Sequence, residues 1–245
     1  MRCKNCGGNC KELGGGKYEC EFCGAIFSEA EARRSVPVSN KSHDSGVDVF
    51  EQNIGGILEI RWRDGNFIHS GSGFLISPDG YAVTNAHVVT SEDGRSVGNI
   101  SVKIKDENLS ATVVALGDNK HGSGNGVDLA LVKLNRLPFG AKILQFEDFN
   151  NVRIGQQVYV VGNSLGYGTC ITSGIVSDKQ RNVNGKMLLM TDCAVNGGNS
   201  GGPIFNEKGL VIGAMVSGIN SAEGMNFAIP SSTVLEFIRK NKIYI

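Results

Sequence analysis

The sequence lacks several features that would point to particular classes of protein. Its 245 residues hold five prolines and one tryptophan, and 24 Lys plus Arg balance 24 Asp plus Glu for a formal net charge of zero. A chain without net charge gives no overall electrostatic reason to bind nucleic acid or an anionic membrane surface. No apolar run approaches the roughly 20 residues of a membrane span, and cysteines and charges occupy the N-terminal segment where a signal peptide would be apolar. We therefore expect a cytoplasmic protein with no membrane partner, and the composition gives no strong signal for nucleic-acid binding.

Glycine, by contrast, is abundant, with 34 residues. A high glycine content suits short strands joined by tight turns better than a helical bundle. From about Ile54 onward, β-branched and apolar runs alternate with Gly, Asn, Asp and Pro, which predicts six strands in each half of the remaining chain. The predicted strands are 56–63, 66–76, 81–85, 101–104, 111–117 and 129–134, then 157–162, 169–177, 187–192, 203–205, 210–216 and 225–229. Hydroxyl residues that can cap a helix and an apolar stripe predict a C-terminal helix over 231–241. The expected fold class is all-β with one C-terminal helix.

Five of the seven cysteines lie within residues 1–27. Four of them form two Cys-x-x-Cys pairs separated by thirteen residues, and the fifth, Cys10, is one of those thirteen. The pairs are Cys3 with Cys6 and Cys20 with Cys23. Four thiolates satisfy tetrahedral zinc, and a module this small needs such a staple because it cannot bury a core. We predict a structural zinc ribbon with these four ligands, although Cys10 could replace one of them. A disulfide-linked module is less favoured without a secretion signal.

The remaining chain divides at a change of composition. Residues 28–48 are polar with almost no apolar periodicity, which predicts a linker. One large domain is then expected over residues 49–245. Cys170 and Cys193 lie in neighbouring predicted strands and could approach each other, but we expect buried free thiols.

A glycine-rich segment in the second half places Ser200 among four glycines, directly before an apolar strand. Glycines permit positive φ and close backbone approach, so that consecutive N–H groups can converge on one point. Gly198, Asn199 and Ser200 are the candidate donors of an oxyanion hole, in which each donor contributes about 3 kcal/mol. Taken alone, the segment is equally compatible with an ordinary β-turn.

A serine nucleophile needs a base, and His87 has the best context of the four histidines. It follows a predicted strand, Pro-Asp-Gly turn and strand, whereas His43, His69 and His121 lie in the linker, within a strand and in a loop. An imidazole can take a serine proton near neutral pH and return it to a leaving amine. Asp128 opens a buried strand and must find a hydrogen-bond partner, which a histidine N–H would provide. Taken alone, Asp128 is more compatible with a solvated loop aspartate.

Together these segments closely resemble the HtrA (Deg) family of trypsin-like serine proteases. The resemblance runs from about residue 55 to 230, and the order His, Asp, Ser is that of the chymotrypsin group. The motifs on which it rests are Gly71-Ser-Gly-Phe-Leu-Ile-Ser, Thr84-Asn-Ala-His-Val-Val, Asp128-Leu-Ala-Leu-Val-Lys-Leu, Gly197-Gly-Asn-Ser-Gly-Gly-Pro and Asn226-Phe-Ala-Ile-Pro. The resemblance implies two six-stranded antiparallel β-barrels, with the site between them.

The resemblance also implies the roles of the three residues. His87 is the general base and then the acid, Asp128 orients His87, and Ser200 forms the acyl-enzyme. Ala194 occupies the place where trypsin-like pockets carry an acid, so cleavage after Lys or Arg is not expected. The expected substrate-binding residues, which favour small or aliphatic P1 side chains, are Ala194, Val195, Val216, Ser217 and Gly218.

The chain departs from many family members because we expect no PDZ domain after Pro230. The expected partners are protein or peptide substrates, with a protein docking on the zinc ribbon as a further one. Two other classes of function stay open. One is a chaperone or peptide-binding module on a protease fold, and the other is a nucleic-acid or protein adaptor that binds through residues 1–27.

Overall fold

The structure is a computed structural model that describes residues 3, 9–21, 24–28, 45–91, 94–117, 126–216 and 224–245. It divides into two compact units, Met1–His43 and Asp44–Ile245. Each unit is described by itself below.

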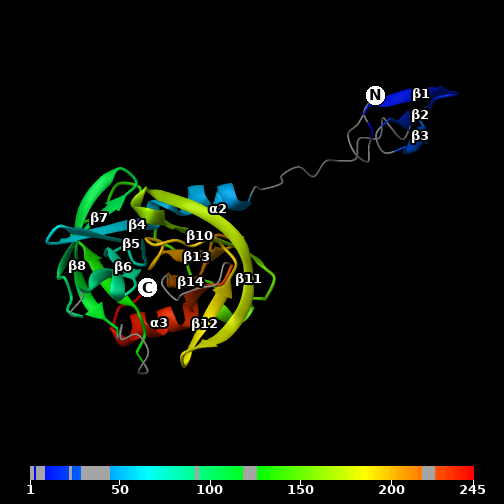
Figure 1. Cartoon of the computed structure of the whole chain (residues 1–245). Coiled ribbons are helices and arrows are strands. Elements are labelled where there is room, and N and C mark those ends of the chain that lie inside the picture. The colour runs from blue at the N-terminus through cyan, green and yellow to red at the C-terminus, as the bar shows by residue number, and fades with distance from the viewer. Residues whose placement is uncertain are drawn as a thin grey trace. The chain divides into compact units, whose positions relative to one another are not determined.

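The N-terminal unit contains a three-stranded antiparallel sheet in the order β1-β2-β3 (Figure 1). The strands are β1 (Cys10–Gly14), β2 (Lys17–Cys20) and β3 (Ile26–Ser28). Positive φ angles at the hairpin glycines Gly14, Gly15 and Gly16 allow β1 to turn into β2. The buried cluster of this unit is small and contains Cys3, Cys20 and Phe27.

The large unit consists of two closed, six-stranded antiparallel barrels (Figure 1). The first has the order β4-β5-β6-β9-β8-β7 and the second the order β10-β11-β12-β15-β14-β13. The first barrel contains β4 (Ile57–Asp64), β5 (Phe67–Leu75), β6 (Tyr81–Thr84), β7 (Asn99–Ile104), β8 (Glu107–Leu116) and β9 (Ala130–Leu134). The second contains β10 (Gln157–Asn163), β11 (Thr169–Val183), β12 (Lys186–Thr191), β13 (Pro203–Asn206), β14 (Val211–Val216) and β15 (Asn226–Pro230). The predicted fold class and the six-plus-six arrangement are confirmed.

Alternating burial along single strands shows why these residues form barrels. In β7, Ile100, Val102 and Ile104 are buried, whereas the residues between them are wholly or partly exposed. Successive side chains of a strand point to opposite faces, so this pattern places one face in the barrel core. Strands such as β13 and β14 are buried almost throughout because both of their faces are covered.

One strand is longer than predicted. β11 continues past Ser177 through the polar run Asp178–Val183, which has no apolar alternation to mark it as a strand. Pairing with β12 holds the extension, through a hairpin in which Asn184 and Gly185 both have positive φ. Cross-strand hydrogen bonds therefore supply a strand here that the apolar pattern did not indicate.

Within the described residues, the α-helices α2 (Ser45–Asn53) and α3 (Ser231–Lys240) flank the barrels. α3 matches the predicted C-terminal helix, whereas α2 begins inside the segment predicted as a linker. α2 packs through Val49 and Phe50 against the core that contains second-barrel residues, and the Ser45 hydroxyl hydrogen-bonds to Tyr159. Short 3-10 turns complete the set: η1 (Ile54–Gly56), η2 (His87–Val89), η3 (Phe149–Asn151) and η4 (Ser164–Gly166). Within the described part of the chain, neither helix has the length and apolarity that crossing a bilayer requires.

Candidate active site

The structure brings His87 and Asp128 together at the ends of two adjacent strands. β6 leads into η2, whose first residue is His87, and β6 pairs with β9, which begins two residues after Asp128. His87 Nδ1 lies 2.6 Å from Asp128 Oδ2, and the His87 backbone N–H donates to Asp128 Oδ1 at 2.9 Å. Both carboxylate oxygens are therefore used to hold one histidine. The Asp128 side chain is 11% exposed and that of His87 27%, so the imidazole remains the accessible member of the pair.

The turn that carries His87 is held from a second side by Trp62. The indole N–H of Trp62 donates to the carbonyl oxygen of Val88 at 2.8 Å. The other face of the turn packs closely, since a Cβ added at Gly71 would lie 2.5 Å from Val88 Cγ1. Trp62 also stacks on His69, with ring centroids 4.0 Å apart. His69, which we did not predict as a site residue, is thus part of the packing beside the turn.

The segment containing Ser200 lies against the first barrel. The backbone N–H of Ser72 donates to the carbonyl oxygen of Ser200 at 2.8 Å. Gly201 has a φ of 81°, and a Cβ there would lie 2.4 Å from Thr84 Oγ1 and 2.8 Å from the Asn85 backbone nitrogen. Ser200 itself is 4% exposed. It directly precedes Gly201, so its segment lies against the residues just before His87. The segment that carries Ser200 therefore packs against the end of β6, the strand that leads to His87.

The glycines before Ser200 shape the loop as the sequence suggested. Gly198 has a φ of 94°, and a Cβ there would lie 2.2 Å from the carbonyl oxygen of Asn163. Only glycine fits this position without moving the backbone. The N–H of Asn199 donates to the carbonyl of Asn196 at 3.2 Å, which places this donor in a local turn. Of the predicted oxyanion donors, Asn199 is therefore turned away, leaving Gly198 and Ser200 as the candidates.

Two neighbouring groups fix the orientation of the Gly198 segment. The Ser72 hydroxyl donates to the carbonyl of Gly198 at 2.7 Å and accepts the Asn163 backbone N–H at 2.8 Å. The backbone N–H of Leu165 donates to the carbonyl of Gly197 at 2.6 Å. Because the C=O and N–H of a trans peptide point in opposite directions, this bond turns the Gly198 N–H away from η4. Ser72 and Leu165, which lie outside the glycine run, therefore determine the direction of the Gly198 N–H.

Leu165 makes this contact in an uncommon backbone conformation. Its φ is 53° and its ψ is 16°, in the left-handed region, and its side chain is 62% exposed. The loop is also tied to the first barrel, because Arg61 Nη2 donates to the Gly166 carbonyl at 3.0 Å. Buried Glu59 accepts from both the backbone N–H and the hydroxyl of Thr169, at 3.2 and 3.1 Å. The first barrel thus holds the loop that orients the Gly197 carbonyl.

Sequence reasoning missed Ser72 and Leu165. Ser72 lies in the Gly-Ser-Gly motif of β5, and a serine buried between two glycines of a strand was a signal that could have been used. Leu165 carries no comparable signal, because its role comes from its backbone amide and its φ.

The predicted substrate-binding residues lie partly within the described chain. Ala194 and Val195 follow β12, with the Ala194 carbonyl accepting from the Thr172 hydroxyl at 2.9 Å and Val195 packing on the second-barrel core. Val216 ends β14 opposite Phe227 of β15. Asn226, beside Phe227, donates to the Cys193 carbonyl at 2.8 Å and so links the two segments. Ser217 and Gly218 lie outside the described residues.

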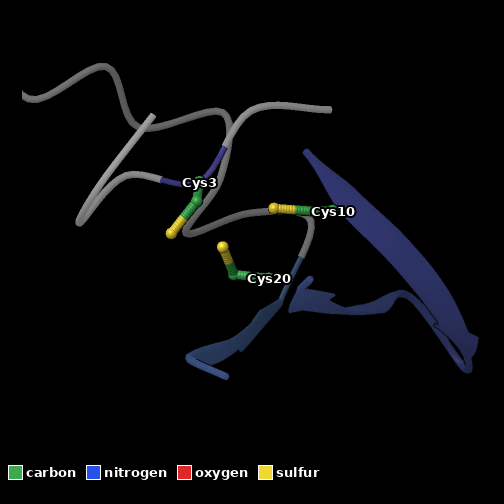
Figure 2. Close-up of side chains that lie close together, drawn as sticks. All are labelled: Cys3, Cys10 and Cys20. Carbon is green, nitrogen blue, oxygen red and sulfur yellow. The ribbon is translucent and has the colours of Figure 1, made fainter. Parts of the chain in front are cut away.

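In the N-terminal unit, the thiols of Cys3, Cys10 and Cys20 converge (Figure 2). Their sulfur atoms all lie within 4.8 Å of one another. The predicted ligands Cys6 and Cys23 lie outside the described residues. The Gly24 N–H donates to the Cys20 carbonyl at 3.0 Å. Burial and then the neighbouring thiols Cys20 and Cys3 raise the pKa of the Cys10 thiol.

The two remaining cysteines are free thiols that differ in environment. Cys193 is buried, and desolvation raises its pKa to about 11, whereas Cys170 is exposed. The expectation of two buried free thiols therefore holds for Cys193 and is wrong for Cys170. Cys170 is the second residue of β11 and pairs with Gly162 of β10.

Comparison with known proteins agrees with this site. Residues 71–213, which include His87, Asp128 and Ser200, match the family described as "Trypsin-like peptidase domain". The "Probable periplasmic serine endoprotease DegP-like" of Rickettsia conorii is 38% identical over 231 residues, covering 89% of this chain and 42% of that protein. The protein of the same name from Chlamydia pneumoniae is 41% identical over 171 residues, covering 66% of this chain and 32% of that protein.

Solved structures give the same result. The serine endoprotease from Yersinia pestis has a TM-score of 0.66 and 26% identity, covering 80% of this chain and 65% of that one. The HtrA-type protease AlgW with a tripeptide has a TM-score of 0.67 and 26% identity, covering 79% and 62%. The fold is that of the chymotrypsin-type proteases. The chain belongs to the family of trypsin-like peptidase domains, and the relatives and structures that it resembles are DegP-like and HtrA-type proteases.

The comparisons also correct the expected location. The relatives are named periplasmic endoproteases, which contradicts the expectation of a cytoplasmic protein. That expectation rested on cysteine content and on the composition of the first residues, and neither fixes a compartment. The chain spans less than half the length of these curated relatives.

Proposed function

We propose that the chain is a serine endopeptidase that hydrolyses protein or peptide substrates through an acyl-enzyme on Ser200. The observation that carries this proposal is the two-point attachment of His87 to Asp128, at 2.6 and 2.9 Å, at the junction where the Ser200 segment meets the first barrel. The names of the DegP-like relatives support it.

In this mechanism Asp128 keeps the proton of His87 on Nδ1, so that Nε2 is available to accept the hydroxyl proton of Ser200 as the serine attacks the scissile carbonyl. The carboxylate also stabilises the imidazolium that forms. His87 then returns the proton to the leaving amine, and water repeats the sequence to release the acyl group. Backbone N–H groups of Gly198 and Ser200 would hold the oxyanion.

The substrate preference that we propose is for small or aliphatic P1 side chains. The segment Ala194–Val195 and the end of β14 at Val216 supply apolar side chains and no acid among the described residues. A pocket without a buried acid cannot offset the desolvation of a Lys or Arg side chain. Cleavage of a peptide set that varies only at P1 should give the highest kcat/KM with Val, Ile or Ala.

The direct test of the activity compares the wild-type chain with Ser200→Ala on an unfolded protein such as casein. Cleavage by the wild type and its loss in the variant are expected. Equal cleavage by both proteins would refute the proposal. If casein stayed intact with the wild type yet bound equally to both proteins, a peptide-binding module would be favoured instead.

We also propose that the N-terminal unit binds one structural zinc ion. The donor set fits, because three thiol sulfurs lie within 4.8 Å of one another and tetrahedral Zn–S bonds of 2.3 Å would place them about 3.8 Å apart. Cys3, Cys10 and Cys20 are in position to contribute, together with Cys6 and Cys23 from the two-pair spacing. When bound, the metal would supply the cross-link that a unit with so small a core requires. We further propose that the N-terminal unit is a docking site for another protein.

Metal analysis tests the zinc proposal. Chain purified under reducing conditions should contain about one zinc per chain, the content of a single ribbon. Cys3→Ser should lower this content, whereas Cys170→Ser, which changes a thiol of the second barrel, should not. A value near zero for the reduced wild type would show that the cysteine cluster is not a metal site.

A further inference from the structure

The N-terminal unit holds one thiol more than a tetrahedral metal site requires. Residues 1–27 contain five cysteines, and a structural zinc ion takes four ligands. One of the five thiols is therefore not a ligand in any four-coordinate arrangement. The described residues show which thiols are placed to react with each other.

Cys10 and Cys20 are direct cross-strand partners. In the β1–β2 ladder Cys10 pairs with Cys20 at the end of the hairpin, and their sulfur atoms lie within the 4.8 Å cluster (Figure 2). Residues directly opposite in an antiparallel pair have Cα atoms about 4.5–5.5 Å apart, and a disulfide needs about 4.4–6.8 Å. The backbone separation is thus already suitable, and only side-chain rotation has to bring the two sulfurs into bonding distance.

The two thiols also differ in accessibility. Cys10 is half-buried on β1, which among the described strands pairs with β2 alone, whereas Cys20 is buried in the small core. An oxidant in solution therefore meets Cys10 first. Cys20 can reach that sulfur from inside the unit.

We propose that Cys10 and Cys20 form a redox-responsive pair that controls metal retention, an inference that rests on the proposed zinc site. The oxidant is a disulfide compound, R–S–S–R. The Cys10 thiolate attacks it, forming a mixed disulfide and releasing one thiolate RS⁻. The Cys20 thiolate then attacks the Cys10 sulfur, forms the Cys10–Cys20 disulfide and releases the second RS⁻.

The two cysteine sulfurs lose two electrons in total, which reduce the oxidant to two RS⁻ ions. One RS⁻ takes up the proton that the Cys10 thiol gave up, the other takes a proton from water, and zinc keeps its charge. The new disulfide removes both Cys10 and Cys20 from the possible donors. At most three cysteines then remain, and the ion is released.

The experiment treats the full zinc-loaded chain with oxidised glutathione. A chromophoric chelator follows zinc release, and peptide mass spectrometry of a non-reducing digest maps the disulfide. We expect about one zinc released per chain, with a Cys10–Cys20 disulfide appearing at the same rate. Cys10→Ser should release zinc at least tenfold more slowly, whereas Cys170→Ser should behave as the wild type.

Two results would overturn the inference: zinc release accompanied by a different disulfide, or retention of zinc while Cys10 and Cys20 become linked. Disulfide mapping of the wild type decides the pairing even if Cys10→Ser does not fold. An absence of metal from the reduced wild type would instead reject the zinc proposal on which the inference rests.

Discussion

The backbone of Leu165 offers a sharp test of how the Ser200 loop is oriented. The backbone N–H of Leu165 donates to the Gly197 carbonyl oxygen at 2.6 Å, and the φ angle of Leu165 is 53°. Glycine adopts this conformation without strain and asparagine tolerates it, whereas a β-branched residue is strongly disfavoured there. A series of Leu165→Gly, Leu165→Asn and Leu165→Ile therefore separates the role of the backbone from that of the side chain.

The expected magnitude follows from two limits. A left-handed conformation costs an ordinary L-residue about 1–2 kcal/mol, and branching at Cβ raises this cost. Complete loss of one oxyanion donor lowers kcat by about 10²–10³-fold. We expect Leu165→Ile to lower kcat about 10- to 100-fold because part of the population releases Gly197 and turns the Gly198 N–H away.

The assay is steady-state hydrolysis of a peptide substrate, with thermal unfolding measured on the same samples. Leu165→Gly and Leu165→Asn should keep kcat within about threefold of the wild type, since both keep the donor in place. KM should change little in all three, because the oxyanion forms only during reaction. Equal losses in all three variants would show that the exposed side chain acts instead, and full activity of Leu165→Ile would refute the reasoning.

Further predictions concern the triad, the loop and the buried thiol. Asp128→Asn should lower kcat/KM about 10³–10⁴-fold, because the amide no longer holds the required tautomer of His87; a loss below tenfold in the same peptide assay would contradict this role. Ser72→Ala should lower kcat about tenfold or more by freeing the Gly198 carbonyl, whereas Ser91→Ala, at an exposed turn, should have no effect. Burial raises the pKa of Cys193 to about 11 from 9.0, so its contribution to stability is complete below pH 9 and is lost as the pH rises toward 11. Urea unfolding should accordingly show the wild type losing about 1 kcal/mol more than Cys193→Ala between pH 8 and pH 10; an equal loss would argue against a buried neutral thiol.

Most of the fold could be predicted from the sequence because its signals are local. Apolar alternation marks barrel strands such as β7, and glycine or asparagine marks the turns between them. α2 was missed because it is short and mainly polar, and it is stabilised by packing on residues far away in the chain. The extension of β11 was missed for a related reason, since its pairing with β12 compensates for a polar sequence.

The candidate site divides in the same way. His87, Asp128 and Ser200 could be predicted because each lies in a motif with its own local signature and the three occur in a known order. Ser72 and Leu165 act through backbone groups of a segment more than 30 residues away. Such contacts depend on how the two barrels close on each other, and no local pattern records that.

The central claim is that Ser200 is a nucleophile activated by His87. A fluorophosphonate probe reacts only with an activated serine, and mass spectrometry of the labelled chain identifies the residue that carries it. The account predicts labelling on Ser200 in the wild type and none in Ser200→Ala, with labelling at least 10²-fold slower in His87→Ala. Labelling at another residue, or at an equal rate in His87→Ala, would contradict it.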